Sequence, residues 1–149
     1  PAAPSTAPAP PRSIRPAALP PPSNAADVER AWRTLRKDEG AWRDYVRALP
    51  PARVEALFAK SLPADILSAV LAALAQTATN EAESAAHAFG ILRAMSRAGR
   101  FSILVMCLDQ ADSRHAATIF GALEGFASVG ALNDITAAEV NALRKEYEQ

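Results

Sequence analysis

Three side chains that could bind a metal ion, Asp109, Asp112 and His115, recur at near-helical spacing. Carboxylates and imidazoles are common zinc ligands, so this group is the first candidate site in the chain. Both carboxylates, however, lie where we expect a helix to begin, and acidic side chains there stabilise the positive end of the helix dipole. No second cluster of ligands completes a coordination shell. We therefore predict neither a metal site nor a bound cofactor.

Nucleophilic catalysis would need a hydroxyl or thiol beside a positioned base. Cys107, the only cysteine, lies in the apolar run 103–108, which offers no such base. His87 lies among alanines, where a partly exposed surface position is the simpler interpretation. Glycine-rich loops that could cradle a phosphate are absent from the sequence. The sequence therefore predicts that this chain is not an enzyme.

The residues between Gly99 and Cys107 are better suited to binding a partner protein than to catalysis. Arg100 could form a bidentate hydrogen bond with a partner carboxylate, while Ile103, three positions on, buries apolar area beside it. The alternative is that Arg100 is an ordinary solvated residue at a helix junction and Ile103 fills the core. Phe101 belongs to the core in either case. The residues alone leave both alternatives open.

Basic residues gather between positions 30 and 47, namely Arg30, Arg33, Arg36, Lys37, Arg43 and Arg47. Such a stripe could meet an acidic protein surface or a nucleic-acid backbone. Interleaved acidic residues at positions 27 to 44 favour an ordinary salt-bridged face instead. The whole chain carries a formal net charge of zero. Because nucleic-acid-binding domains are usually strongly basic, we expect no nucleic-acid partner.

The elements that position these residues follow a proline-rich lead-in. Nine of the 12 prolines lie within the first 22 of the 149 residues. Prolines fix φ and remove backbone donors, so residues 1–23 are predicted to be a disordered linker. A ligand for a proline-binding groove is the alternative for this segment. Residues 24–149 are predicted to form one helical interaction domain.

From Asn24 onward the sequence is typical of a series of capped helices. Asn24, Asp38, Asp109 and Thr136 are predicted N-caps, and Pro51 and Pro63 are predicted to open two further helices. Gly99 is expected to supply a left-handed residue that ends a helix. Ser102 is expected to cap the next one, with Phe101 and Met106 forming a hydrophobic staple. We therefore predict an all-α fold, an irregular bundle or short superhelical array of about seven to eight helices.

The surroundings of the protein can also be inferred. A lone cysteine fits a reducing compartment, so we expect a cytoplasmic location, with the nucleus as a second one. No apolar run approaches the length needed to span a bilayer, and the proline-interrupted start does not resemble a signal peptide. The chain does not begin with methionine, so we expect a piece of a longer protein. We expect this piece to be monomeric.

Six short segments follow one another along the chain: Ala31-Trp32-Arg33, Leu49-Pro50-Pro51, Leu57-Phe58-Ala59-Lys60-Ser61-Leu62, Asp65-Ile66-Leu67, Gly99-Arg100-Phe101 and Val105-Met106-Cys107-Leu108. Together they resemble the C-terminal domain of the RNA polymerase II-associated protein 3 family, which is also found in sperm-associated antigen 1 and related dynein-arm assembly factors. The resemblance covers roughly residues 27–147. It rests on the ordered set, because no single segment is diagnostic.

The resemblance implies a non-enzymatic co-chaperone module that docks onto a RuvB-like AAA+ ATPase. Other parts of the parent chain would recruit Hsp90, so the module would link the two machines during assembly of protein complexes. Family contacts map onto Arg100 and Ile103, with Leu104 and Cys107 as additions. Cys107 stands where the family usually has a bulky side chain, and Ser102 where it commonly has Asp. The alternative is a self-association or client-binding domain of a ciliary dynein-arm assembly factor.

Overall fold

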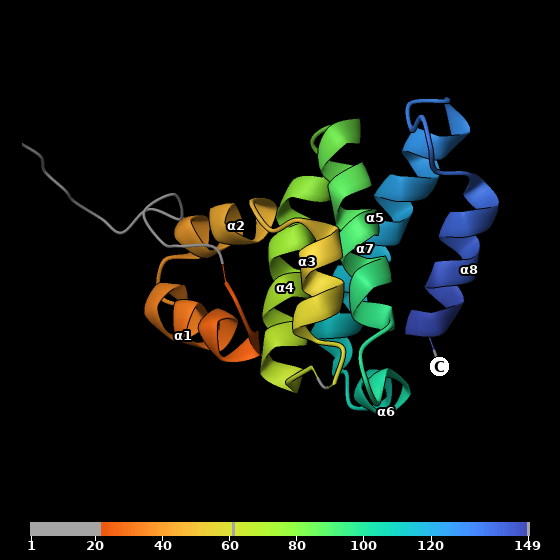
Figure 1. The fold of residues 1–149 in the computed structure, drawn as a ribbon. Helices are drawn as coiled ribbons and strands as arrows, with labels where there is room; N and C mark the ends of the chain where they lie inside the picture. The colour runs from red at the N-terminus through yellow and green to blue at the C-terminus, as the bar shows by residue number, and fades with distance from the viewer. Residues whose placement is uncertain (1–21, 61, 149) are drawn as a thin grey trace, which may run out of the picture.

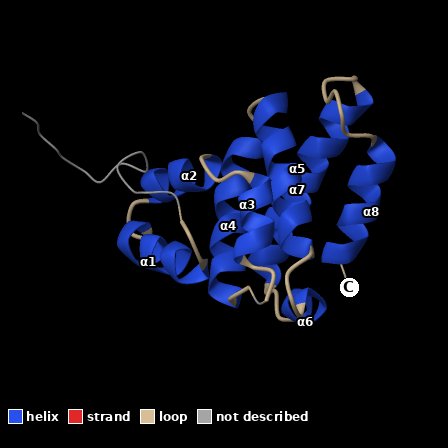
Figure 2. Cartoon of the chain, in the orientation of Figure 1, coloured by secondary structure: helices blue, strands red, loops and turns tan. Residues whose placement is uncertain are grey.

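The structure is a computed structural model that describes residues 22–60 and 62–148. In that part of the chain it contains eight helices and no strand (Figure 2). The helices are α1 (Ala25–Leu35), α2 (Glu39–Arg47), α3 (Pro51–Leu57), α4 (Ala64–Ala78), α5 (Ala82–Ser96), α6 (Phe101–Met106), α7 (Gln110–Ser128) and α8 (Ala137–Tyr147). The predicted all-α fold is therefore confirmed. The predicted disordered linker falls almost entirely on residues 1–21, which lie outside the described residues.

Four helices begin at the side-chain caps that the sequence predicts: Asn24 for α1, Asp38 for α2, Asp109 for α7 and Thr136 for α8. Each cap accepts a hydrogen bond from a backbone N–H that has no partner within the helix. In α7 and α8 the cap is reciprocal, because the acidic side chain three residues later accepts from the backbone of the cap residue. These starts fix where each helix begins relative to the next.

Helices α4 and α5 pack against each other at the centre of the molecule, with α3 against α5 and with α7 packed behind α4 and α5 (Figure 1). On one side α1 and α2 complete the bundle, and on the other α8 packs against α7 and α5. The short helix α6 lies across one end. The central helices meet through large, fully buried side chains, among them Leu67, Leu71, Leu74, Leu92, Met95, Ile119, Phe120 and Leu123. Burying each of these contributes roughly 1.5 to 3 kcal/mol before the loss of chain entropy is counted.

Candidate partner-binding site

Helix α6 begins two residues earlier than the sequence predicts, because Arg100 and not Ser102 is its N-cap. Arg100 adopts the left-handed conformation, with φ 61° and ψ 25°. It is the only residue other than glycine with positive φ in the described residues. Gly99 does not have positive φ, so the expectation that it supplies the left-handed residue is wrong. The chain turns at the arginine instead.

Gly99 is needed for a different reason, which is its close approach to the end of α3. A Cβ atom placed on Gly99 would lie 2.2 Å from the carbonyl oxygen of Lys60, a distance that no real contact allows. The backbone N–H of Gly99 donates to the carbonyl of Ala59 at 3.1 Å. A glycine at this position therefore lets the α5–α6 turn rest directly on the backbone that follows α3.

The inner face of α6 is fixed by aromatic packing against the last residue of α8. Phe101 meets Tyr147 edge-on, with ring centroids 4.9 Å apart, and Tyr147 also lies 5.6 Å from Phe120 of α7. The Tyr147 hydroxyl donates to the carbonyl of Leu92 in α5 at 2.6 Å. Burial, with a smaller effect of the Glu146 charge, raises the pKa of Tyr147 well above its ordinary value. One tyrosine thus ties α6 to three other helices.

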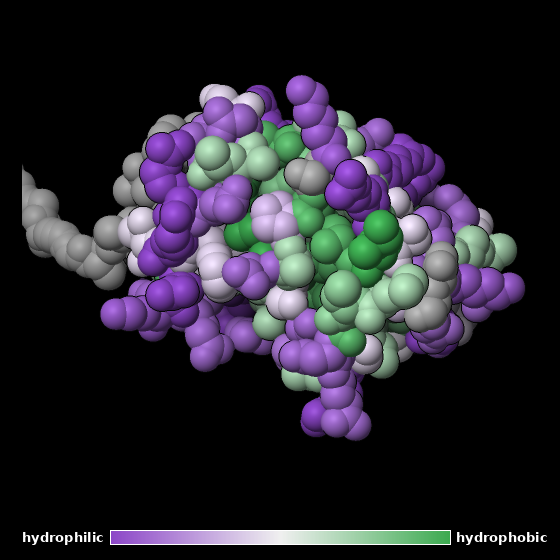
Figure 3. All heavy atoms as spheres, turned by 90° about the horizontal axis from the view of Figure 1, so that it is seen from below, coloured by the Kyte–Doolittle hydropathy of each residue, from purple (hydrophilic) through white to green (hydrophobic). Residues whose placement is uncertain are grey.

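The outer face of α6 is apolar and open to solvent. Ile103 is 56% exposed and Met106 72% exposed, and Cys107 beside them is also exposed. Leu104 is half-buried against the core. Figure 3 views this end of the molecule and shows apolar side chains gathered on it. We call Arg100, Ile103, Met106 and Cys107 the α6 surface.

The structure thus brings the predicted site residues Arg100, Ile103 and Cys107 onto one exposed face, with Leu104 at its inner edge. Met106 was not among the predicted site residues, and its exposure contradicts the predicted staple with Phe101. Helical spacing in the sequence could have identified Met106 as an exposed residue. Phe101 and Val105 point inward, so Ile103 and the residue three positions after it must point outward together.

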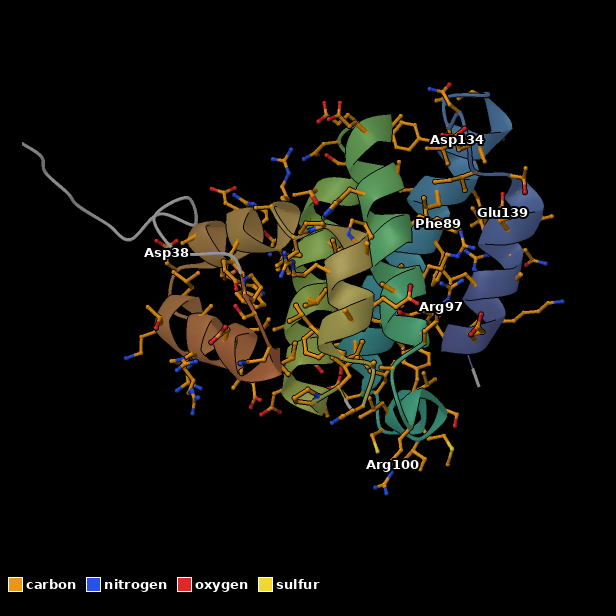
Figure 4. The ribbon with its side chains drawn as sticks, viewed as in Figure 1. Asp38, Phe89, Arg97, Arg100, Asp134 and Glu139 are labelled. Carbon is orange, nitrogen blue, oxygen red and sulfur yellow. The ribbon has the colours of Figure 1, made fainter. Side chains whose placement is uncertain are left out.

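The side chain of Arg100 projects from the end of the molecule, away from the helices (Figure 4). It is exposed, and none of the ion pairs among the described residues involves it. A left-handed conformation costs a residue with a Cβ atom roughly 1 to 2 kcal/mol, and glycine would avoid that cost. An observed backbone outlier of this kind points to function, since neither packing nor an internal ion pair accounts for the arginine.

A cleft of about 350 Å³ opens beside Met106, between α6, α7 and the end of α8. Val105, Leu108, Phe120 and Tyr147 contribute apolar walls, and Ser113 and Glu148 contribute polar ones. Its volume lies at the lower end of the range of ligand-binding clefts and leaves room for a side chain of a partner. The α6 surface therefore combines a projecting cation, a flexible apolar side chain and a hollow next to it.

The other candidate residues in 22–60 and 62–148, those for metal binding and for base catalysis, have structural surroundings that explain them. Asp109 and Asp112 form the reciprocal cap of α7, as expected for carboxylates at a helix start, and Asp112 also accepts a hydrogen bond from Ser68 at 2.7 Å. No group of three or more His, Cys, Asp or Glu side chains in this part of the chain is arranged to hold a metal ion. His87 is partly buried, and its Nε2 lies 2.9 Å from the carbonyl of Leu49. None of the described helices is both long and apolar enough to cross a membrane.

Comparison with known proteins identifies the fold and the family. A family model described as the potential Monad-binding region of RPAP3 matches residues 21–113, which is more than half of the chain. The chain belongs to this family. It is a protein-interaction module of the RPAP3 family, and the predicted resemblance is confirmed.

The RPAP3 relatives are longer proteins. RNA polymerase II-associated protein 3 of Xenopus laevis is 29% identical over 126 residues, which is 85% of this chain and 18% of the relative. The protein of the same name from Mus musculus is 28% identical over 138 residues, which is 92% of this chain and 20% of the relative. The chain therefore spans about a fifth of the length of these relatives.

A solved structure, the NMR structure of the C-terminal domain of the human RPAP3 protein, has the same fold. It matches with a TM-score of 0.75 and 21% sequence identity, over 97% of this chain and 98% of that one. The correspondence confirms the helical architecture through α8, beyond the residues that the family model matches.

Proposed function

We propose that this chain is a non-enzymatic docking module whose α6 surface binds a RuvB-like AAA+ ATPase. In the longer parent protein, other segments would recruit Hsp90, so that the module acts as part of a co-chaperone in the assembly of protein complexes. The observation that carries the proposal is the exposed Arg100, which forms no ion pair with another described residue and is held in a left-handed turn beside Ile103 and Met106. The lone Cys107 thiol fits the reducing cytoplasm or nucleus, where such a partner would be met.

The composition of the α6 surface suits a binding hot spot. Arginine is enriched at hot spots, and its planar guanidinium can hold a partner carboxylate through two parallel hydrogen bonds. Ile103 would bury apolar area next to that ion pair and exclude water from it. The thioether of Met106 adapts its shape to an uneven partner surface, and the cleft beside it can accept a partner side chain. The surface therefore offers both specificity and affinity.

The test is a binding titration of the chain with purified RuvB-like ATPases. Replacing Arg100→Ala together with Ile103→Ala should weaken binding by about a hundredfold, since two hot-spot side chains are lost. The matched control is Lys145→Ala with Val129→Ala, which also removes one exposed cation and one exposed apolar side chain but lies outside the α6 surface. Undiminished binding by the Arg100/Ile103 variant, or equal loss in the control, would refute the proposal.

A Monad-type protein is the second candidate partner, because the matching family model is described as a potential Monad-binding region. A titration with purified Monad, using the same two pairs of variants, separates the possibilities. If Monad binding depends on Arg100 and Ile103, the two partners compete for the α6 surface. If Monad binding is insensitive to both pairs, it uses another part of the domain.

Self-association, or client binding in a ciliary dynein-arm assembly factor, is the alternative function. The exposed apolar side chains of Ile103 and Met106 favour it, because two copies could cover them mutually. Size-exclusion chromatography with light scattering distinguishes this case. A monomer in the absence of the ATPase is the result we expect, and a stable dimer that Ile103→Ala dissociates would support self-association.

A further inference from the structure

A second open groove lies on the side of the molecule formed by α1, α2 and α4, at the left of Figure 1 and away from α8. It encloses about 510 Å³. Trp32 of α1 and Trp42 of α2 form its walls, and Ala69, Ala72 and Ala73 of α4 form its floor. None of its lining residues belongs to the α6 surface. The groove is therefore a separate feature that the proposed ATPase docking does not use.

The aromatic walls are held in place before any partner arrives. The indole N–H of Trp42 donates to the backbone carbonyl of Ala69 at 3.0 Å, and its ring stacks on Tyr45 with centroids 5.6 Å apart. Trp32 packs against the core but keeps part of its ring in solvent. Because these side chains are already ordered, binding would lose little side-chain entropy. A preformed apolar groove is a stronger candidate for recognition than two mobile tryptophans.

The rim of the groove is predominantly positive. The guanidinium of Arg36 lies 5.5 Å from the centre of the Trp32 ring, which orients it while leaving its N–H edge available to a carboxylate. Lys37 follows on the same rim. None of the ion pairs among the described residues uses either cation. Glu39, the carboxylate among the described lining residues, accepts a hydrogen bond from Gln76 at 3.4 Å.

We propose that this groove binds an acidic amphipathic helix of a partner protein. The α4 residues that line it, from Ser68 to Gln76, rise about 12 Å along the helix axis, which is slightly more than two turns of a docked helix. The apolar side chains of that helix would lie between the tryptophans, and its carboxylates would pair with Arg36 and Lys37. The chain's own residues 1–21 suit the rim poorly, because they contain Arg12 and Arg15 and no acidic residue.

The probe is a synthetic peptide of about 18 residues, with Leu and Phe at three- and four-residue spacing and Glu at most other positions, long enough to populate a helix. Its partner peptide carries Lys at every Glu position. We expect the acidic peptide to shift the indole N–H signals of Trp32 and Trp42 in ¹⁵N-correlated spectra of the full chain. The lysine peptide should bind at least about tenfold more weakly, because two ion pairs are lost.

The variant Arg36→Glu with Lys37→Glu should reverse this preference, so that the lysine peptide becomes the tighter ligand. Both side chains are exposed, so the fold should be retained, and circular dichroism checks it. The matched control is Lys145→Glu on α8, which should leave the preference unchanged. Equal binding of both peptides, or shifts only at the α6 surface, would overturn the proposal.

Two further results would overturn the proposal, because each would show that the groove holds something other than an acidic helix. Indole signals that move with protein concentration in the absence of peptide would assign the groove to a second copy of the chain. Indole signals that move when Arg12 and Arg15 are both changed to Ala, again without peptide, would assign it to residues 1–21. Unchanged signals in both experiments, together with the reversed peptide preference, would establish an acidic helix as the ligand class.

Discussion

Arg100 adopts a conformation that costs folding free energy and that glycine would adopt without strain. Its aliphatic stem is not needed to fill the core, because the side chain is exposed and projects away from the helices (Figure 4). Met106 also contributes little to stability, because its side chain is 72% exposed and gains little from burial. At the scale of single residues, the α6 surface therefore contains residues that do not maximise stability, as its proposed role in partner binding would require.

The variant Arg100→Gly tests this trade-off directly. It should raise the free energy of unfolding by about 1 kcal/mol, because glycine relieves the left-handed strain, although the more flexible unfolded chain offsets part of the gain. The same variant should bind the proposed RuvB-like ATPase partner more weakly, because the guanidinium is lost. Urea denaturation and a binding titration measure the two effects. A variant that is less stable, or one that binds as tightly as the original chain, would contradict this interpretation.

At the scale of elements, the position of α6 depends on Gly99. A methyl group there cannot fit beside the Lys60 carbonyl, so Gly99→Ala should push α6 away from α3 and lower the free energy of unfolding by about 2 kcal/mol. Gly121 in α7 is the matched control, because a Cβ atom placed there would meet nothing within 4 Å. Gly121→Ala should instead stabilise the protein by up to about 1 kcal/mol, as alanine favours the helix. Urea denaturation of both variants is the measurement, and equal effects would show that the contact at Gly99 is unimportant.

Most elements could be predicted from local signals, because caps such as Asn24 and Thr136 act within one helical turn. The start of α6 could not, since it depends on a contact between Gly99 and Lys60, which are far apart in sequence. The predicted cap at Ser102 satisfied local rules, but the tertiary contact moved the turn to Arg100. Met106 was misplaced for the same reason. The groove beside Trp32 and Trp42 was not predicted, because it forms only where α1 and α2 pack against α4.

At the scale of the whole molecule, the end of the chain holds the α6 surface in place. The ring of Tyr147 packs against Phe101 of α6 and Phe120 of α7, and its hydroxyl bonds to Leu92 of α5. These contacts join helices that lie far apart in sequence, so local opening of α8 should also loosen α6. The α6 surface is therefore a property of the complete bundle, including residues beyond the segment that the family model matches.

Because the buried Tyr147 holds α6 in place, we predict that the protein becomes less stable at alkaline pH. Burial raises the pKa of Tyr147 in the folded state above its unfolded value of about 10. Below that pH the hydroxyl is neutral in both states and its contribution to stability is fully present. As the pH rises toward the folded-state pKa, the unfolded chain loses the proton first, so this contribution is lost. The pKa of Tyr45 is also raised, by burial and then by Asp27, so Tyr45 adds to the same fall.

Tyr147→Phe isolates the contribution of the C-terminal tyrosine. At about pH 8 the variant should be less stable by about 1 kcal/mol, because the hydrogen bond to Leu92 is lost while the ring packing remains. Between about pH 9 and about pH 11 its free energy of unfolding should fall less steeply than that of the original chain, because one titrating group is gone. Urea denaturation at several pH values gives both quantities. Parallel curves would mean that Tyr147 titrates normally, and the end of α8 would then be too open to fix the α6 surface.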